Sequence, residues 1–429
     1  MKAPSLLVIV SEYSSLSKKS RRLDLLFKIR EYCERVGLNY ELIHMNISPS
    51  LTSQETFKYN NKVKRYLIIL RKPAIFFVIL KALKDCMNLI KETLSKKEKM
   101  FIILIGTEYI PSIYLLVIYL ILKFTLSITN RGKIIFIYDF VDLYLQTYNY
   151  NNFEKVIYNI AELILLNISK IVLASSIIIQ KYLEKRIKYY NKKKREIIYF
   201  PPSVPIDEIA KISNTINKDH IRQRLGFCKN DIILVYTGNI RKELSGLDIL
   251  IEALLKIEKN SSYIFEKVKT LLILNIGHIT DSDYRKLKYA LQQTKFCKKA
   301  VKVLINIDRD EVYRLLSISD FGLALLDPTD SISRQMDWPL KVAEYIACGL
   351  PIIYTPFGRM SVLVADNVHG FKVNRESVDI VKVYNKIYQL DLNDIIKFKK
   401  SITSIRRYID INSYASIIFQ KILNEMRNL

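Results

Sequence analysis

The chain alternates short apolar runs with longer amphipathic segments, and this alternation repeats over most of its length. Apolar runs of strand length occupy residues 6–10, 101–105, 133–138, 231–236 and 301–305. Such continuous runs are typical of parallel strands that are buried on both faces. The segments between them have apolar residues at helical spacing, as crossover helices do. The pattern therefore predicts an α/β fold with parallel sheets.

A proline cluster interrupts this pattern near the middle of the chain. Residues 201–205 read PPSVP, and proline clusters between periodic segments are typical of linkers. A chain of 429 residues is also too long for one typical domain. We therefore expect one domain over residues 1–203 and a second over residues 204–405.

One helix in the second half carries its own start and stop signals. Residues 338–358 read WPLKVAEYIACGLPIIYTPFG, with Pro339 suited to the first helical position and Gly349 to a left-handed stop. At helical spacing Lys341, Glu344 and Cys348 share one stripe. Charged residues on helices usually lie at the surface, so a solvated Lys–Glu pair is one interpretation of this stripe.

A second motif lies upstream of this helix. The expected strand 231–236 is followed by TGNIRKELSG at 237–246 and by an expected helix at 247–257. A strand, a glycine-bearing loop and a helix N-terminus form an anion site through backbone N–H groups and the helix dipole. Arg241 and Lys242 in this loop add positive charge suited to a diphosphate.

The run P-x-K-x-x-E-Y-x-A-C-G-x-P-I-I resembles the donor-binding signature of retaining glycosyltransferases of family 4. The spacing between the 237–246 loop and this run is similar to that of the family. The resemblance implies the GT-B fold, in which two Rossmann-like domains with parallel sheets face across a cleft. It also implies that Glu344 binds the ribose hydroxyls of a nucleotide sugar, and that a helix within 406–429 returns to the first domain. A carboxylate suits this task because its two oxygens accept both hydroxyl protons.

The resemblance assigns further candidate residues. The donor-binding set that it implies is Gly238, Asn239, Arg241, Lys242, Gly246, Gly277, His278, Asp337, Lys341 and Glu344. The catalytic set is Glu344 with Asp139 and Asp142, which follow the expected strand 133–138 and so lie where sheet-end loops carry function. A helix-capping role is the alternative for these two aspartates.

Three positions depart from the family pattern. Relatives commonly have arginine after the first glycine of the loop and lysine before the second, where this chain has Asn239 and Ser245. Relatives also often have a glutamate eight residues before the one that matches Glu344, where this chain has Met336. These differences leave open a degenerate GT-B protein that binds a partner instead of transferring a sugar.

Charge is concentrated in the first half of the chain. The formal net charge is +25, and residues 1–200 contain 33 basic and 16 acidic residues, which gives +17 in that half. A basic surface attracts anionic lipid, phosphorylated substrates or nucleic acid, but no nucleic-acid readout motif is present. A basic and apolar first domain favours a glycan or lipid-linked acceptor and peripheral contact with a membrane.

Residues 110–126 form the most apolar expected helix, with Lys123 as its one charge. About 17 residues is the lower limit for a membrane span. Strands are expected directly before and after this segment, and a span would place them on opposite sides of the bilayer. The pattern therefore favours a core helix or attachment at the membrane surface.

The remaining composition narrows the chemistry. Five cysteines form no C-x-x-C pair, no metal-binding pattern is visible, and the usage is typical of a reducing compartment. Four histidines argue against a sugar-nucleotide epimerase, which needs proton-transfer groups. The resemblance to family 4 implies a glycosyltransferase that uses a nucleoside-diphosphate sugar without metal or cofactor. With the composition, it predicts a protein in the cytoplasm at the cytosolic face of a membrane.

Overall fold

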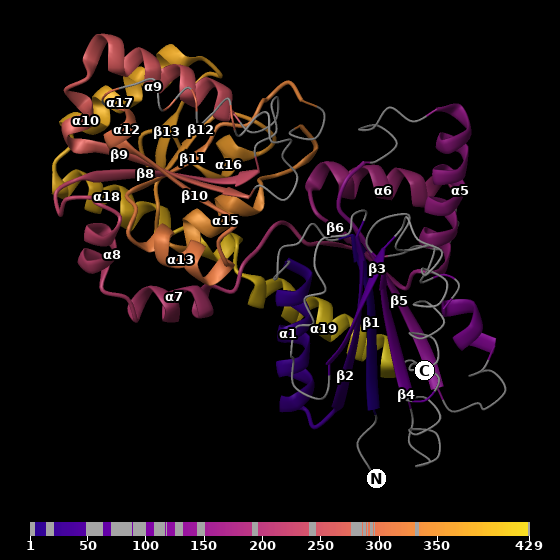
Figure 1. Cartoon of the computed structure of the whole chain (residues 1–429). Helices are drawn as coiled ribbons and strands as arrows, with labels where there is room; N and C mark the ends of the chain where they lie inside the picture. Colours follow the sequence, from indigo (N-terminus) through magenta and orange to yellow (C-terminus); the bar gives the residue numbers. More distant parts are fainter. Residues whose placement is uncertain are drawn as a thin grey trace. The chain divides into compact units, whose positions relative to one another are not determined.

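The structure, a computed structural model, covers most of the chain. It describes residues 5–13, 21–48, 63–69, 88, 100–106, 116, 118–124, 132–143, 151–190, 196–239, 246–275, 285, 289, 291, 295, 297–330 and 334–427. The chain divides into two compact units (Figure 1). The first contains Met1–Ser15, Leu25–Phe200 and Asn412–Leu429, and the second contains Leu16–Asp24 and Pro201–Ile411.

The first unit is built on a seven-stranded sheet in the order β3-β2-β1-β4-β5-β6-β7. Its strands are β1 (Ser5–Tyr13), β2 (Asn39–Ser48), β3 (Val63–Ile69), β4 (Met100–Gly106), β5 (Gly132–Phe140), β6 (Ile171–Ala174) and β7 (Ile197–Tyr199). All described strand pairs are parallel. Its named helices in the described residues are α1 (Arg21–Arg35), α5 (Asn152–Ile168), α6 (Ile177–Tyr190) and α19 (Ile411–Arg427).

The second unit has a six-stranded parallel sheet in the order β10-β9-β8-β11-β12-β13. Its strands are β8 (Ile232–Asn239), β9 (Val268–Asn275), β10 (Val301–Ile305), β11 (Phe321–Ala324), β12 (Ile352–Tyr354) and β13 (Gly370–Lys372). Its longer helices are α7 (Ile206–Asn214), α9 (Leu247–Ser261), α13 (Arg309–Ser317), α15 (Leu340–Ala347), α17 (Ser377–Gln389) and α18 (Leu392–Thr403). Shorter helical segments are α8 (Lys218–Arg224), α10 (Ile264–Lys267), α12 (Cys297–Ala300), α16 (Met360–Leu363) and η1 (Arg406–Tyr408).

The apolar run of β8 is buried on both faces of this sheet. Ile233 and Val235 belong to one core cluster, whereas Leu234 and Tyr236 belong to the other. Successive side chains of a strand point to opposite faces, and helices cover both faces of a parallel sheet. The predicted α/β class is therefore confirmed, with two Rossmann-like units.

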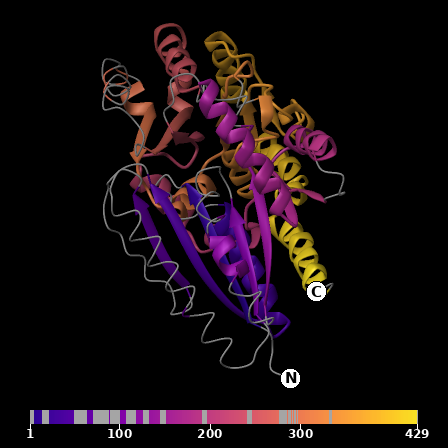
Figure 2. The ribbon, with the colours of Figure 1, turned by 90° about the vertical axis from the view of Figure 1, so that its right-hand side faces the viewer.

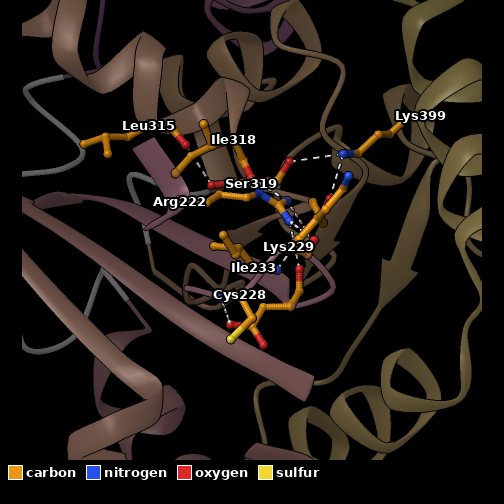
Figure 3. A network of polar contacts seen from close by, with 10 residues as sticks. Arg222, Cys228, Lys229, Ile233, Leu315, Ile318, Ser319 and Lys399 are labelled. Carbon is orange, nitrogen blue, oxygen red and sulfur yellow. Dashed lines mark hydrogen bonds and ion pairs between the residues drawn. The ribbon is translucent and has the colours of Figure 1, made fainter. Parts of the chain in front are cut away.

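A network of polar contacts fixes the amino ends of β8 and β11 (Figure 3). The Arg222 guanidinium donates to the carbonyl of Ile318 at 2.7 Å and to Asp320 Oδ2 at 2.9 Å. Asp320 Oδ2 also accepts from the N–H of Ile233 at 2.9 Å, and Lys399 Nζ lies 2.8 Å from Asp320 Oδ1. The network thus ties α8, β8, β11 and α18 together.

The expected apolar helix at 110–126 is described only in part. Residues 116 and 118–124 are helical, with Ile118 and Leu122 buried and Leu120 and Phe124 exposed. This segment therefore has one packed side and one exposed side. Among the residues that the structure describes, no helix is long and apolar enough to cross a membrane.

Candidate donor-binding site

The second sheet has a topological switch point between β8 and β11. The chain runs from β8 outward to β9 and β10, whereas β11, β12 and β13 extend the sheet in the other direction. Ligands in open α/β sheets bind outside the carboxyl ends of the strands at such a point. A ligand-binding site is therefore expected at the segments that follow β8 and β11.

Gly246 brings the N-terminus of α9 against the carboxyl end of β11. Its φ is +64°, and a Cβ atom at this position would lie 1.8 Å from the carbonyl oxygen of Leu325. Only glycine tolerates both the left-handed conformation and this close approach. The backbone N–H groups in the first turn of α9 are thus held beside the ends of β8 and β11, where they can bind an anion.

Part of the predicted phosphate loop lies outside the described residues. Arg241 and Lys242 belong to residues 240–245, which the structure does not describe, and only the backbone of Asn239 is described, opposite Asn275 of β9. Gly277 and His278 also lie outside the described residues.

Tyr345 fixes α15 against the carboxyl end of β8. Its hydroxyl accepts from the N–H of Thr237 at 2.9 Å and donates to the carbonyl of Leu323 at 3.3 Å. A Cβ atom on Gly322 would lie 2.4 Å from the Tyr345 ring, so a glycine in β11 lets the helix pack closely. Gly349 ends α15 at a φ of +72°, as predicted for a left-handed stop.

Lys341 lies beside the first glycine of the loop. Its Nζ atom is 4.3 Å from the centre of the Tyr236 ring, and a Cβ atom on Gly238 would lie 3.1 Å from it. Burial lowers the pKa of Lys341 to about 8, against the opposing effect of Glu344. A lysine with this pKa is mostly protonated at neutral pH, so a cation lies next to the backbone where the phosphate loop begins.

Glu344 is largely buried on the same helix and forms an ion pair with Arg309. Its Oε1 atom lies 3.5 Å from Arg309 Nε, and the Glu344 side chain is 12% exposed. Burial raises the pKa of Glu344 above its usual value, whereas the charge of Arg309 lowers it. The pair is too long for a good hydrogen bond, so the carboxylate keeps acceptor capacity for another donor.

Arg309 was not among the residues predicted from the sequence. It is the first residue of α13, and its NH1 group donates to Asp24 Oδ2 at 2.9 Å. Asp24 lies in the first turn of α1, in the part of that helix that belongs to the second unit. Its Nε and NH2 atoms are buried without a hydrogen-bond partner in the structure. In the sequence the Asp308-Arg-Asp310 run resembles a charged turn, and nothing in it indicates a partner on α15.

Two other candidate positions have structural roles. Asp337 is fully buried, with its Oδ2 atom 3.6 Å from Arg359 NH1 and its carbonyl oxygen accepting from the Arg359 N–H at 3.1 Å. Met336, at the position of the absent family glutamate, packs against the apolar core. The Asp337 carboxylate therefore points into the protein, towards Arg359.

The two candidate catalytic aspartates belong to the first unit. Asp139 is buried within β5, which extends two residues beyond the predicted strand and ends at Phe140. Asp142 follows the strand and is partly exposed. In the second unit, Lys341 lies beside Gly238, and Glu344 follows Lys341 on the same helix.

Comparisons with known proteins point to a glycosyltransferase. Residues 217–402 match the family described as glycosyl transferases group 1. The chain is 22% identical over 335 residues to chitobiosyldiphosphodolichol beta-mannosyltransferase of Candida albicans, which covers 76% of this chain and 68% of that protein. A match of 335 residues is longer than either compact unit, so it includes residues of both.

Solved structures resemble the whole chain. A glycosyltransferase from Rickettsia africae aligns with a TM-score of 0.65 at 17% identity, covering 99% of both chains. Sucrose-phosphate synthase from Thermosynechococcus elongatus aligns with a TM-score of 0.64 at 12% identity, covering 99% of this chain and 100% of the other. Anabaena HepE in complex with UDP-glucose aligns with a TM-score of 0.63 at 13% identity, with coverage of 99% and 100%. These likenesses show the GT-B fold.

Proposed function

We propose that this glycosyltransferase, whose residues 217–402 match the family described as glycosyl transferases group 1, transfers a sugar from a nucleoside-diphosphate sugar to a glycan or lipid-linked acceptor. The observation that carries this proposal is the placement of Lys341 and Glu344 on α15 at the carboxyl end of β8. One side chain supplies a cation for a diphosphate, and the other supplies a carboxylate for hydroxyl groups.

In the proposed complex the diphosphate lies between Lys341, the backbone at Gly238 and the N-terminus of α9. The helix dipole and the lysine stabilise the charge that develops as the nucleoside diphosphate leaves, so the reaction proceeds without a bound metal or cofactor. The Glu344 carboxylate accepts hydrogen bonds from the ribose hydroxyls and so orients the donor. The UDP-glucose complex of HepE, a protein of the same fold, supports this choice of donor class.

The proposed acceptor is a lipid-linked molecule, and the proposed transfer retains the anomeric configuration of the sugar. The name of the Candida albicans relative describes mannosyl transfer and a lipid-linked acceptor, which supports a lipid-linked acceptor here. The resemblance of the α15 segment to family 4 supports retention of anomeric configuration, whereas the relative is named a β-mannosyltransferase. With an α-linked nucleotide sugar, retention gives an α-glycoside and inversion gives a β-glycoside. We propose retention of configuration, at the cytosolic face of a membrane.

Sugar transfer to extracted lipids tests the proposal. Labelled UDP- and GDP-sugars are incubated with the full chain and a lipid extract, and NMR of the product gives its anomeric configuration. We expect one sugar to be transferred with retention, and the Glu344→Gln variant to be at least tenfold slower. A folded protein that transfers no sugar from any donor contradicts the proposed activity, and a β-linked product from an α-linked donor contradicts retention.

A further inference from the structure

Helix α5 of the first unit presents a continuous apolar stripe to solvent. The five exposed residues of the stripe are Phe153, Val156, Ile157, Ile160 and Ile164. Their spacing of i, i+3, i+4, i+7 and i+11 places them on one face of the helix. Phe153 is 74% exposed and Ile160 is 52% exposed. A continuous apolar stripe that is open to solvent in this way is unusual for a helix.

The opposite face of α5 is fixed to the protein. Glu162 is fully buried, and its Oε1 atom accepts from Arg186 Nε at 2.8 Å and from the Tyr182 hydroxyl at 3.0 Å. Arg186 also donates to Asn159 of α5. At about 100° per residue, Glu162 points away from Phe153 and the rest of the stripe. These contacts hold α5 to α6, so the stripe faces outward.

Helix α6 carries a row of exposed lysines. Ile179, Leu183 and Ile187 are buried, whereas Lys181, Lys185 and Lys188 are exposed. Lys181 and Lys185 each follow a buried residue by two positions, which is about 200° around the helix. The lysine row therefore faces away from the packed side of α6.

Helices α5 and α6, which carry the stripe and the lysine row, lie on the same face of the sheet. Strands β5, β6 and β7 are consecutive neighbours and parallel, with α5 connecting the first two and α6 the last two. Right-handed crossovers in the same direction place both helices on one face of the sheet. Figure 1 shows α5 and α6 side by side, and Figure 2 turns the side of Figure 1 on which α5 lies towards the viewer. We call the five apolar residues and three lysines the α5–α6 surface.

We propose that the α5–α6 surface binds an anionic membrane, with the apolar stripe in the interfacial region and the lysines at lipid phosphates. An apolar helix face beside exposed lysines is the combination that lies flat on anionic lipid. The charge of this half of the chain thus complements lipid phosphates. This inference rests on the proposed membrane-bound acceptor and is independent of the donor site.

Vesicle flotation of the full chain tests the membrane contact directly. We expect wild type to float with phosphatidylcholine vesicles that contain phosphatidylglycerol, and to float poorly with phosphatidylcholine alone. The double change Ile157→Glu and Ile160→Glu should reduce the bound fraction at least tenfold. Both positions are exposed, so we expect an unchanged melting temperature.

A matched isoleucine serves as the control. Ile417 of α19 is 54% exposed, close to the value for Ile160. Helix α19 stacks on α1 through Phe419 and Tyr32, with ring centres 5.3 Å apart. Helix α1 connects β1 to β2, and this step across the sheet is opposite in direction to the steps from β5 to β6 and from β6 to β7. Because the crossovers are right-handed, α1 lies on the other face of the sheet from α5 and α6. Ile417→Glu should therefore bind vesicles as wild type does.

The lysine row is tested by a separate variant that leaves the stripe intact. Changing Lys181, Lys185 and Lys188 to glutamine should lower affinity for the phosphatidylglycerol vesicles by roughly fivefold per lysine and weaken its salt dependence. Nucleotide affinity, measured on the same variants without lipid, should stay at the wild-type value and so separates this inference from the donor site.

Three results would overturn the inference. They are equal flotation of wild type and the Ile157→Glu/Ile160→Glu variant, no flotation of folded wild type with either vesicle, and a wild-type dimer that this variant converts to monomer without any lipid binding. The last result would identify the surface as a contact between two copies of the chain.

Discussion

Arg309 Nε lies 3.5 Å from Glu344 Oε1, although the two residues belong to different helices of the second unit. Arg309 is the first residue of α13, whereas Glu344 lies in the middle of α15. Burial alone would favour the neutral form of Glu344, and the guanidinium opposes this. The pair therefore keeps a largely buried carboxylate available as an acceptor before the donor binds.

Replacing Arg309 with glutamine should make nucleotide binding sensitive to mild acid. Without the guanidinium the pKa of Glu344 rises further, so its carboxylate becomes protonated at a higher pH and accepts fewer hydrogen bonds. Calorimetry should show affinity that increases with pH up to neutrality in Arg309→Gln, but less steeply in wild type. Arg309→Lys keeps a positive charge and should lie between them. Identical pH profiles for wild type and Arg309→Gln would contradict the role given to this pair.

Because Lys341 titrates, nucleotide affinity and the stability of the protein should change with pH in opposite directions. Its pKa in the folded protein is about 8, below the usual 10.5, so the unfolded chain binds more protons between these values. The free energy of unfolding should therefore rise with pH from about 8 to about 10.5. Nucleotide affinity should fall over the same interval, because the cation beside Gly238 loses its charge.

The Lys341→Met variant provides the control for both measurements. It lacks the titrating amine, so its nucleotide affinity should be low and nearly constant between neutral pH and about 10. Its free energy of unfolding should not show the rise with pH that we expect for wild type. Chemical denaturation and calorimetry at several pH values measure the two quantities. A wild-type affinity that stays constant through this interval is incompatible with a phosphate contact by Lys341.

Gly246→Ala should destabilise the second unit more than a comparable glycine change. Both Gly246 and Gly226 have left-handed backbones, at φ of +64° and +76°. An added Cβ at Gly226 meets Lys302 Nζ at 3.6 Å, whereas one at Gly246 would lie 1.8 Å from Leu325 O. Gly226→Ala should cost about 1–2 kcal/mol, and Gly246→Ala more because the backbone of α9 must move. Equal losses of unfolding free energy in the two variants would show that the structure accommodates the added Cβ at Gly246 without extra cost.

Arg222→Ala should separate stability from donor binding. The Arg222 side chain donates to Ile318 and Asp320 at the amino ends of β8 and β11, away from the site at their carboxyl ends. Lys399 still pairs with Asp320 in this variant, so the loss of stability should be smaller than the cost of about 3–5 kcal/mol for an uncompensated buried charge. The melting temperature should fall clearly, while nucleotide affinity of the remaining folded protein should match wild type. A loss of affinity without a loss of stability would place Arg222 in the site instead.

The apolar runs predicted strands β1, β4, β5, β8 and β10. A central strand such as β4 is continuously apolar because it is buried on both faces. Shorter elements such as β13 were missed, since a three-residue strand carries no period. Gly349 was predicted correctly as a helix stop, because its local sequence determines that conformation.

The site was less accessible to sequence reasoning, because it depends on contacts between distant segments. The approach of Lys341 to Gly238 and of Arg309 to Glu344 is set by the packing of α15 through Tyr345, which the sequence pattern does not specify. Exposure of the α5 stripe was likewise not predictable, since an apolar helix face is ordinarily a packed one.

The most direct test of the account is the affinity of wild type and Glu344→Gln for UDP and GDP by calorimetry. Glutamine keeps the shape but loses the charge, so the loss of charge-assisted hydrogen bonds should cost about 1.5–3 kcal/mol, or roughly ten- to a hundredfold in affinity. Glu311→Gln, in a more exposed ion pair with Arg224, should bind as wild type does. We predict that one nucleotide binds wild type and that Glu344→Gln alone weakens it, whereas equal affinity of wild type and Glu344→Gln would contradict the assignment of Glu344 to the donor.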